Sequence, residues 1–184
     1  MTFGATTAPR IANAADAAGL ARVHVTSWHE TYTGLVPDEL LSTLSIEHRT
    51  TVWKRMLDDP SSFNGLRIFV SECRGEIVGF GSCGKQRAAI LAAIGLDAEV
   101  EAIYVLRSSQ GRGVGRALVR TMAADLFRRG HRGMSLWVLR ENAKARRFYE
   151  RLGGVVVAEK EERRAGGVLV EVAYGWRGLG PLMA

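Results

Sequence analysis

The most constraining feature of this sequence is a glycine-rich segment, Gln110-Gly111-Arg112-Gly113-Val114-Gly115-Arg116. It follows a segment of alternating character, 99–105, and precedes a stretch of helical periodicity, 114–129. Such a turn leaves free backbone N–H groups at the start of the helix, where the helix macrodipole also attracts an anion. The segment therefore predicts either a pyrophosphate-binding loop or a tight turn that needs glycine for its geometry alone.

Two better-known phosphate-binding motifs fit this segment poorly. A Walker loop requires Gly-Lys-Ser/Thr, which the segment lacks. A dinucleotide-binding fingerprint requires an acid about twenty residues further on, at the end of the next strand. Here the next predicted strand, 134–139, is followed by Arg140 and only then by Glu141. The dinucleotide fingerprint is thus the weaker interpretation, although Glu141 keeps it open.

The placement of charge indicates an anionic partner. The chain has a formal net charge of +6, and the segment 107–151 holds twelve Arg or Lys against three acids, so that segment is +9 and the remainder is −3. A phosphorylated cofactor or a nucleic acid would explain the excess, and so would ordinary solvated helix faces. Aromatic residues do not interleave with the basic ones, so we expect no nucleic-acid partner.

Hydrophobic periodicity predicts an α/β domain with a mixed sheet. Helices are predicted from Asn13, with Asp16 in the first turn, to Trp28, and over 38–57, 114–129 and 142–152. Strands are predicted over 66–73, 76–83, 99–105, 134–139, 155–161 and 168–174, with a turn at 165–167 and a loop over 85–97 that could hold one helical turn. Strict alternation in 99–105 would place Val100, Ala102 and Tyr104 on one face and Glu99, Glu101, Ile103 and Val105 on the other.

The remaining sequence features predict one domain, residues 1–184, in the cytoplasm. Residues 1–9 show no signal-peptide pattern, and no apolar run approaches the roughly 18 residues that span a bilayer, so we expect no membrane partner. A hairpin turn at Arg74-Gly75 would pair Cys73 with Glu76 and Cys83 with Leu66, too far apart for a disulfide. The cysteine spacing also predicts no metal site.

Two motifs together resemble the GNAT superfamily of N-acetyltransferases. The acetyl-CoA signature of that superfamily, Q/R-x-x-G-x-G/A, is met by Gln110, Gly113 and Gly115. Its later helix, N-x-x-A-x-x-F-Y-x-x-x-G, is met by Asn142, Ala145, Phe148, Tyr149 and Gly153. The resemblance covers 66–152 well, is loose over the first 60 residues and returns at 171–174. It implies a GNAT fold: a central mixed, largely antiparallel sheet with helices on both sides and a splay between the fourth and fifth strands.

The resemblance also implies an activity, the transfer of acetyl from acetyl-CoA to a primary amine by direct attack in a ternary complex, without a metal. The pantetheine arm would lie in the splay, between 99–105 and 134–139, bound by main-chain groups and by Asn142. The implied acetyl-CoA-binding residues are Ile103, Val105, Gln110, Gly111, Arg112, Gly113, Val114, Gly115, Arg116, Asn142 and Tyr149. The alternative is a non-catalytic acyl-CoA-sensing or partner-binding module on the same fold, and a homodimer is an open expectation.

Three residues are the catalytic candidates that the resemblance implies. Tyr149 would protonate the leaving thiolate or donate a hydrogen bond to it, although a tyrosine on an apolar helix face could equally be core. Glu99 matches the strand position where some family members place a general base, and Glu101 follows two residues later. We favour Glu99. The two carboxylates could raise one another's pKa, or they could be a pair of solvated acids.

The candidate acceptor pocket lies in the N-terminal helices. Trp28, Glu30, Tyr32 and Trp53 lie where the family builds that pocket, and aromatic and acidic side chains suit an amine. A packed helical hairpin predicts the same residues. The four histidines, His24, His29, His48 and His131, show neither triad nor metal spacing, so we expect structural roles for them.

Overall fold

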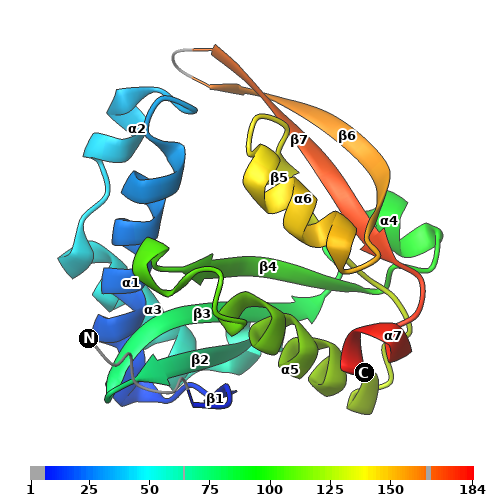
Figure 1. Cartoon of the computed structure of the whole chain (residues 1–184), viewed down its shortest axis with the longest axis horizontal. Coiled ribbons are helices and arrows are strands. Elements are labelled where there is room, and N and C mark those ends of the chain that lie inside the picture. Colours follow the sequence, from blue (N-terminus) through cyan, green and yellow to red (C-terminus); the bar gives the residue numbers. More distant parts are fainter. Residues whose placement is uncertain (1–6, 64, 165–166) are drawn as a thin grey trace.

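The structure, a computed structural model, describes residues 7–63, 65–164 and 167–184. Across these residues a seven-stranded sheet has the order β1-β2-β3-β4-β5-β7-β6 (Figure 1). The strands are β1 (Arg10–Ile11), β2 (Arg67–Cys73), β3 (Glu76–Lys85), β4 (Ala98–Val105), β5 (Met134–Leu139), β6 (Val155–Arg164) and β7 (Gly167–Trp176). Neighbouring strands are antiparallel except for the parallel pair β4 and β5. This confirms the predicted mixed, largely antiparallel sheet.

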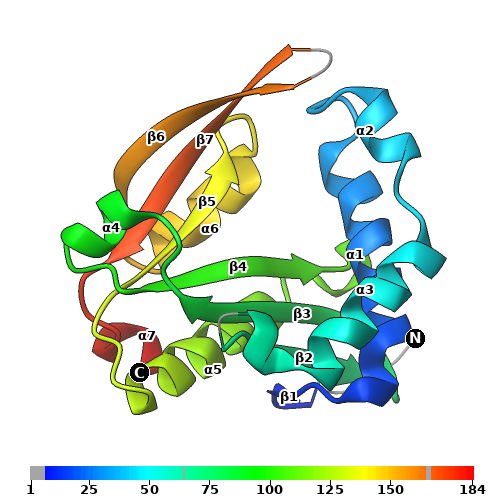
Figure 2. The same ribbon diagram turned by 180° about the vertical axis from the view of Figure 1, so that it is seen from behind.

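Helices cover both faces of the sheet, as predicted. The α-helices are α1 (Ala17–Tyr32), α2 (Asp38–Ser42), α3 (Ile46–Asp58), α4 (Ala89–Ala93), α5 (Val114–Arg128), α6 (Ala143–Arg151) and α7 (Gly180–Met183), and short 3₁₀ helices span Ala14–Asp16, Pro60–Phe63 and Arg107–Ser109. Helix α5 lies in front of the sheet in Figure 1, whereas α1 and α3 cover the opposite face, seen in Figure 2. Among the described residues, no helix has both the length and the apolar character that crossing a membrane requires.

The sheet opens between its two central strands. Over the described residues, β4 and β5 pair only at Ala98 with Met134 and at Glu99 with Ser135. Beyond these two positions β5 slants away from β4, and β7 and β6 follow it (Figure 1). This divergence confirms the predicted splay, and it creates the opening on which the functional site depends.

A β-bulge in β4 makes the predicted strict alternation wrong. Ser82 of β3 pairs with Ala102 and Cys83 with Val100, so the register passes over Glu101. The extra residue puts Val100 in the α5-side core, against which Ile103 and Val105 also pack. Ala102 and Tyr104 pack instead in the core under α1.

Two smaller differences also have local physical causes. The helix predicted over 38–57 is two helices, because the Ser45 side chain accepts a hydrogen bond from the His48 N–H (3.2 Å) and starts α3 afresh. Cys73 pairs with Glu76 as predicted, but a register shift after Ser71 places Cys83 opposite Arg67 rather than Leu66. The two cysteines form no disulfide within the described part of the chain.

The elements near the two termini agree only in part with the sequence-based predictions. Asn13 and Asp16 form the predicted N-terminal cap, although the first turn is a 3₁₀ helix. The two-residue strand β1 and the last helix, α7, were not predicted from the sequence. Two predictions concern segments that lie partly outside the described residues: the lack of a signal peptide in 1–9 and the turn at 165–167.

His24 of α1 is enclosed by aromatic rings. Its ring stacks on Tyr104 at a centroid distance of 5.0 Å, and the rings of Trp28, Trp53 and Phe80 lie within 6.1 Å. His24 is 8% exposed, and neither ring nitrogen has a hydrogen-bond partner among the described residues. Burial lowers the pKa of His24 to about 4, and the positive charge of Arg49 adds to this effect.

This burial predicts a loss of stability in acid. The unfolded chain protonates His24 near its ordinary pKa of 6.5, while the folded chain resists protonation down to about pH 4. Between these values stability falls as the pH falls, by up to about 2 kcal/mol from pH 7.5 to pH 5. Urea unfolding at both pH values should show that His24→Phe removes this part of the loss. Exposed His48 supplies the control, since His48→Gln should retain it; an equal loss in wild type and His24→Phe would contradict the assignment.

Candidate active site

The opening between β4 and β5 forms a groove of about 780 Å³. All of the predicted acetyl-CoA-binding residues line it except Arg112 and Val114, and Val114, the first residue of α5, is buried. The predicted residues in the lining are Ile103, Val105, Gln110, Gly111, Gly113, Gly115, Arg116, Asn142 and Tyr149. The structure thus brings together residues from three separate segments of the sequence, 103–105, 110–116 and 142–149.

One wall of the groove is the free edge of β4. The Leu106 N–H donates to the Val78 carbonyl of β3 (3.0 Å). Main-chain groups alternate between the two edges of a strand, so Tyr104 also faces β3, whereas Ile103 and Val105 turn their N–H and C=O groups toward the opening. These two residues are the ones predicted to offer main-chain hydrogen bonds.

The glycine-rich turn closes one end of the groove. Gly111 and Gly113 have φ values of +74° and +83°, which cost an L-residue roughly 1–2 kcal/mol. Gly113 is the N-cap of α5, and it supplies no capping side chain for the first N–H groups of the helix. Space in front of the turn is open, since a Cβ at either glycine would meet no described atom within 4 Å. Gly115 serves packing instead, because a Cβ there would lie 3.2 Å from the Phe148 ring.

Gln110 and Glu30 hold the turn in place. Gln110 donates through Nε2 to the Val105 carbonyl (2.9 Å) and accepts through Oε1 from Lys144 of α6. The Glu30 carboxylate accepts from the Arg107 N–H (2.7 Å). Glu30 therefore lies on the groove, beside the 3₁₀ turn after β4, rather than in the acceptor pocket where it was expected.

Tyr149 belongs to both the core and the groove. Its ring lies 5.8 Å from that of Tyr174 and meets Trp176 edge-on at 6.3 Å, yet the residue also lines the groove. Burial raises the pKa of the Tyr149 hydroxyl well above its usual range, and nearby Tyr104 adds to the rise. The hydroxyl therefore keeps its proton at neutral pH, so it can donate a hydrogen bond.

Asn142 connects the groove to α1. Its side chain caps α6 by accepting from the Ala145 N–H (3.1 Å), and the residue is 9% exposed. Burial raises the pKa of the Tyr32 hydroxyl far above its usual range, while a hydrogen bond from Asn142 opposes that rise. Tyr104 and Tyr149 add to the rise in the Tyr32 pKa, and Tyr104 adds to that of Tyr149, which indicates that the three tyrosines lie near one another.

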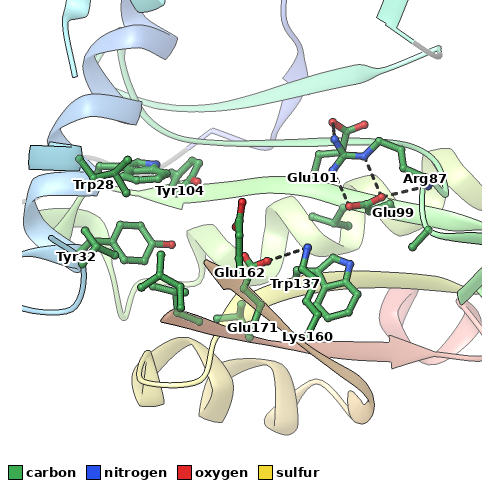
Figure 3. Close-up of a pocket in the computed structure, with 17 residues that line it drawn as sticks. Trp28, Tyr32, Arg87, Glu99, Glu101, Tyr104, Trp137, Lys160, Glu162 and Glu171 are labelled. Carbon is green, nitrogen blue, oxygen red and sulfur yellow. Dashed lines mark hydrogen bonds and ion pairs between the residues drawn. The ribbon is translucent and has the colours of Figure 1, made fainter. Parts of the chain in front are cut away.

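A second cavity, of about 520 Å³, adjoins the groove at this point (Figure 3). Both cavities are lined by Tyr32, Glu101 and Tyr104. The aromatic and charged side chains of the second cavity are Trp28, Tyr32, Tyr104 and Trp137, then Glu99, Glu101, Glu162 and Glu171, and finally Arg87 and Lys160. We call this cavity the acidic pocket. Trp28 and Tyr32, two of the candidate acceptor-pocket residues, line it, whereas Trp53 is buried in the core under α1.

Arg87 distinguishes the two candidate bases (Figure 3). The Arg87 guanidinium donates to both carboxylate oxygens of Glu99, through Nη2 (2.7 Å) and Nε (3.1 Å). The main-chain N–H of Arg87 donates a third hydrogen bond to Glu99 (3.3 Å). Its contact with Glu101 is a single, longer ion pair of 3.3 Å. Burial raises the pKa of Glu101 above its ordinary value, Arg87 lowers it, and Glu99 raises it. Glu101 alone of the two also lines the groove.

Several lining residues escaped the sequence analysis. Arg87 lies in a stretch predicted as a loop, and no motif marks it. Lys160 and Glu162 alternate along β6, and Glu171 lies on β7, so the period of two could have placed them on one face. Only the tertiary structure shows that this face borders the splay.

The Acetyltransferase (GNAT) family model matches residues 26–154, a range that includes both walls of the groove. The chain belongs to the GNAT acetyltransferase family. A GNAT relative from Bacillus subtilis, named "Uncharacterized N-acetyltransferase YuaI", is 34% identical over 173 residues, which cover 94% of each chain. The protein is thus an N-acetyltransferase, as the sequence predicted.

Solved GNAT structures share the fold. The PaiA N-acetyltransferase of Thermoplasma acidophilum, in complex with coenzyme A, superimposes with a TM-score of 0.70 at 18% identity, covering 91% of this chain and 98% of that one. YncA, a putative acetyltransferase of Salmonella typhimurium with its cofactor acetyl-CoA, gives 0.66 at 24% identity and covers 94% of each chain.

The geometry of the turn predicts how acetyl-CoA binding can be abolished. Acetyl-CoA should raise the melting temperature of the wild type, and Gly113→Asp should remove this shift by placing bulk and negative charge before the α5 N-terminus. Gly95 has a similar φ of +85° and lies outside the groove lining, so Gly95→Asp introduces the same strain and charge as a control. Scanning fluorimetry should show the shift intact in that variant. Loss of the shift in both variants, or its absence in the wild type, would contradict the assignment.

Proposed function

We propose that this protein transfers the acetyl group of acetyl-CoA to a primary amine by direct attack in a ternary complex. The observation that carries the proposal is that the groove and the acidic pocket meet at Glu101, Tyr32 and Tyr104. A thioester in the groove and an amine in the acidic pocket would face one another there. Direct transfer needs this arrangement, whereas a module that only senses acyl-CoA does not.

The groove suits acetyl-CoA, whose thioester supplies an activated acetyl group. The first N–H groups of α5 and the side chains of Arg116 and Lys144 favour the negative charge of a pyrophosphate. Ile103 and Val105 present main-chain hydrogen-bonding groups that suit the amides of a pantetheine arm.

The acceptor must lose a proton before it can attack. An alkylamine with a pKa near 10.4 is neutral in about 1 molecule in 2,500 at pH 7, a penalty of about 4.6 kcal/mol. We assign the general base to Glu101, directly or through a water, rather than to Glu99, which the sequence analysis favoured. Three hydrogen bonds from Arg87 occupy Glu99, whereas Glu101 borders both cavities and has a raised pKa.

Tyr149 stabilises the leaving group. As the new C–N bond forms and the C–S bond breaks, the sulfur gains negative charge, and the protonated Tyr149 hydroxyl can donate a hydrogen bond to it. Glu101 takes up the proton that the amine loses, and the departing thiolate takes its proton from solvent. Tyr149→Phe keeps the ring in the core, so the variant should fold but lose roughly tenfold or more in kcat, about 1.4 kcal/mol. Full activity in the folded variant would leave Tyr149 a purely structural role.

The alternative, a non-catalytic acyl-CoA-sensing module, predicts binding without turnover. Release of free thiol from acetyl-CoA in the presence of a panel of amines separates it from the proposed enzyme. The single domain, the cytoplasmic location, the absence of a metal, nucleic-acid or membrane partner, and the homodimer stay predictions.

The assignment of the base predicts a pH dependence. Glu101 is inactive when protonated, so kcat/KM for an alkylamine should rise with pH through the raised pKa of Glu101. Glu101→Gln should lower the rate at neutral pH by about 10²-fold or more and flatten this limb. Glu99→Gln removes the same charge two residues away and should keep the limb. The rate with an arylamine, which is already neutral at pH 7, should fall less in Glu101→Gln. An unchanged pH dependence of kcat/KM for the alkylamine in Glu101→Gln would contradict the assignment.

A further inference from the structure

The acidic pocket has the opposite charge to the protein around it. The chain is +6 overall. Among the described residues, the pocket is lined by four carboxylates and two cationic side chains, so it has two more acidic groups than basic ones. An excess of negative charge in a pocket focuses the field there and attracts a positively charged ligand. It also disfavours an amino acid as the acceptor, because the substrate's own carboxylate would add to the repulsion.

One cation of the protein already shows how the pocket holds an ammonium group. The Lys160 Nζ lies 4.4 Å from the centre of the Trp137 ring and 2.9 Å from the Glu171 carboxylate. An aromatic face and a carboxylate together favour an ammonium group. Glu162 lines the same pocket and is two residues from Lys160 on β6 (Figure 3). The side of the pocket formed by β6 and β7 therefore offers groups that can bind an ammonium, in addition to Glu101 on β4.

We propose that the acceptor is an amine with at least one further positive charge, of the alkyl diamine or polyamine class. Glu101 binds the reacting amine, and Glu162, beside the ion pair of Lys160 and Glu171, binds the distal ammonium. Apolar lining from Val138, Leu139 and Leu169 provides a surface for the methylene chain between the two charges. This inference rests on the proposed function, since it places the reacting amine beside Glu101.

Equilibrium binding tests the inference without requiring turnover. In isothermal titration calorimetry, the protein saturated with CoA is titrated with α,ω-diaminoalkanes and with n-alkylamines of matching length. The best diamine should bind at least tenfold more tightly than its matched monoamine, and the ratio should shrink in high salt because screening weakens the second charge contact. Glu162→Gln should reduce the ratio about fivefold. Glu161→Gln removes the same charge from β6 outside the pocket lining, so it should leave the ratio unchanged.

Two results of the binding experiment would overturn the inference. One is a diamine that binds no more tightly than its monoamine, undetectable binding included, and the other is an equal effect of the Glu161 and Glu162 variants. The proposed function fails by a different result, the absence of thiol release with every amine tried. A diamine preference in binding would still support the charge assignment in that case. Thiol release with monoamines and diamines at equal kcat/KM would support the enzyme but contradict the inference.

Discussion

The unpaired edge of β4 is the constraint on which this structure depends. Strands β4 and β5 pair at only two described positions, and beyond them β4 has main-chain groups that face an opening instead of a strand. A polar group removed from water without a partner costs about 1–3 kcal/mol, so this edge must stay hydrated or be paired by a ligand. The glycine-rich turn follows β4 and α6 follows β5, so the same divergence brings Tyr149 and the groups that are proposed to bind the pyrophosphate to one groove.

Charge is divided between the two cavities. Arg116 and Lys144 border the groove and come from the segment whose positive charge is evident in the sequence. The acidic pocket combines Glu101 of β4 with Glu162 and Glu171 of β6 and β7, which lie some sixty residues further along the chain. One cavity thus suits an anionic cofactor and its neighbour a cationic acceptor. Their meeting point at Tyr104 is where transfer between the two substrates is proposed to occur.

Local periodicity was sufficient to predict most strands and the long helices, because amphipathic patterns are local properties. The groove was predicted instead from the two motifs that resemble the GNAT superfamily. The bulge at Glu101 was missed, since it depends on how β4 pairs with β3. Arg87 was missed for a related reason: its importance comes from its hydrogen bonds to Glu99, which only the folded chain brings near. Family position alone favoured Glu99 as the base, whereas the observed contacts of Arg87 support Glu101.

The central claim is that the free edge of β4 binds the pantetheine arm. Amide hydrogen exchange measured by NMR, with and without saturating acetyl-CoA, tests it residue by residue. The N–H groups of Ile103 and Val105 should exchange at least tenfold more slowly when acetyl-CoA is bound. The N–H of Tyr104 faces β3 and should change much less. Unchanged exchange at Ile103 and Val105 in a protein shown to bind acetyl-CoA would contradict the account.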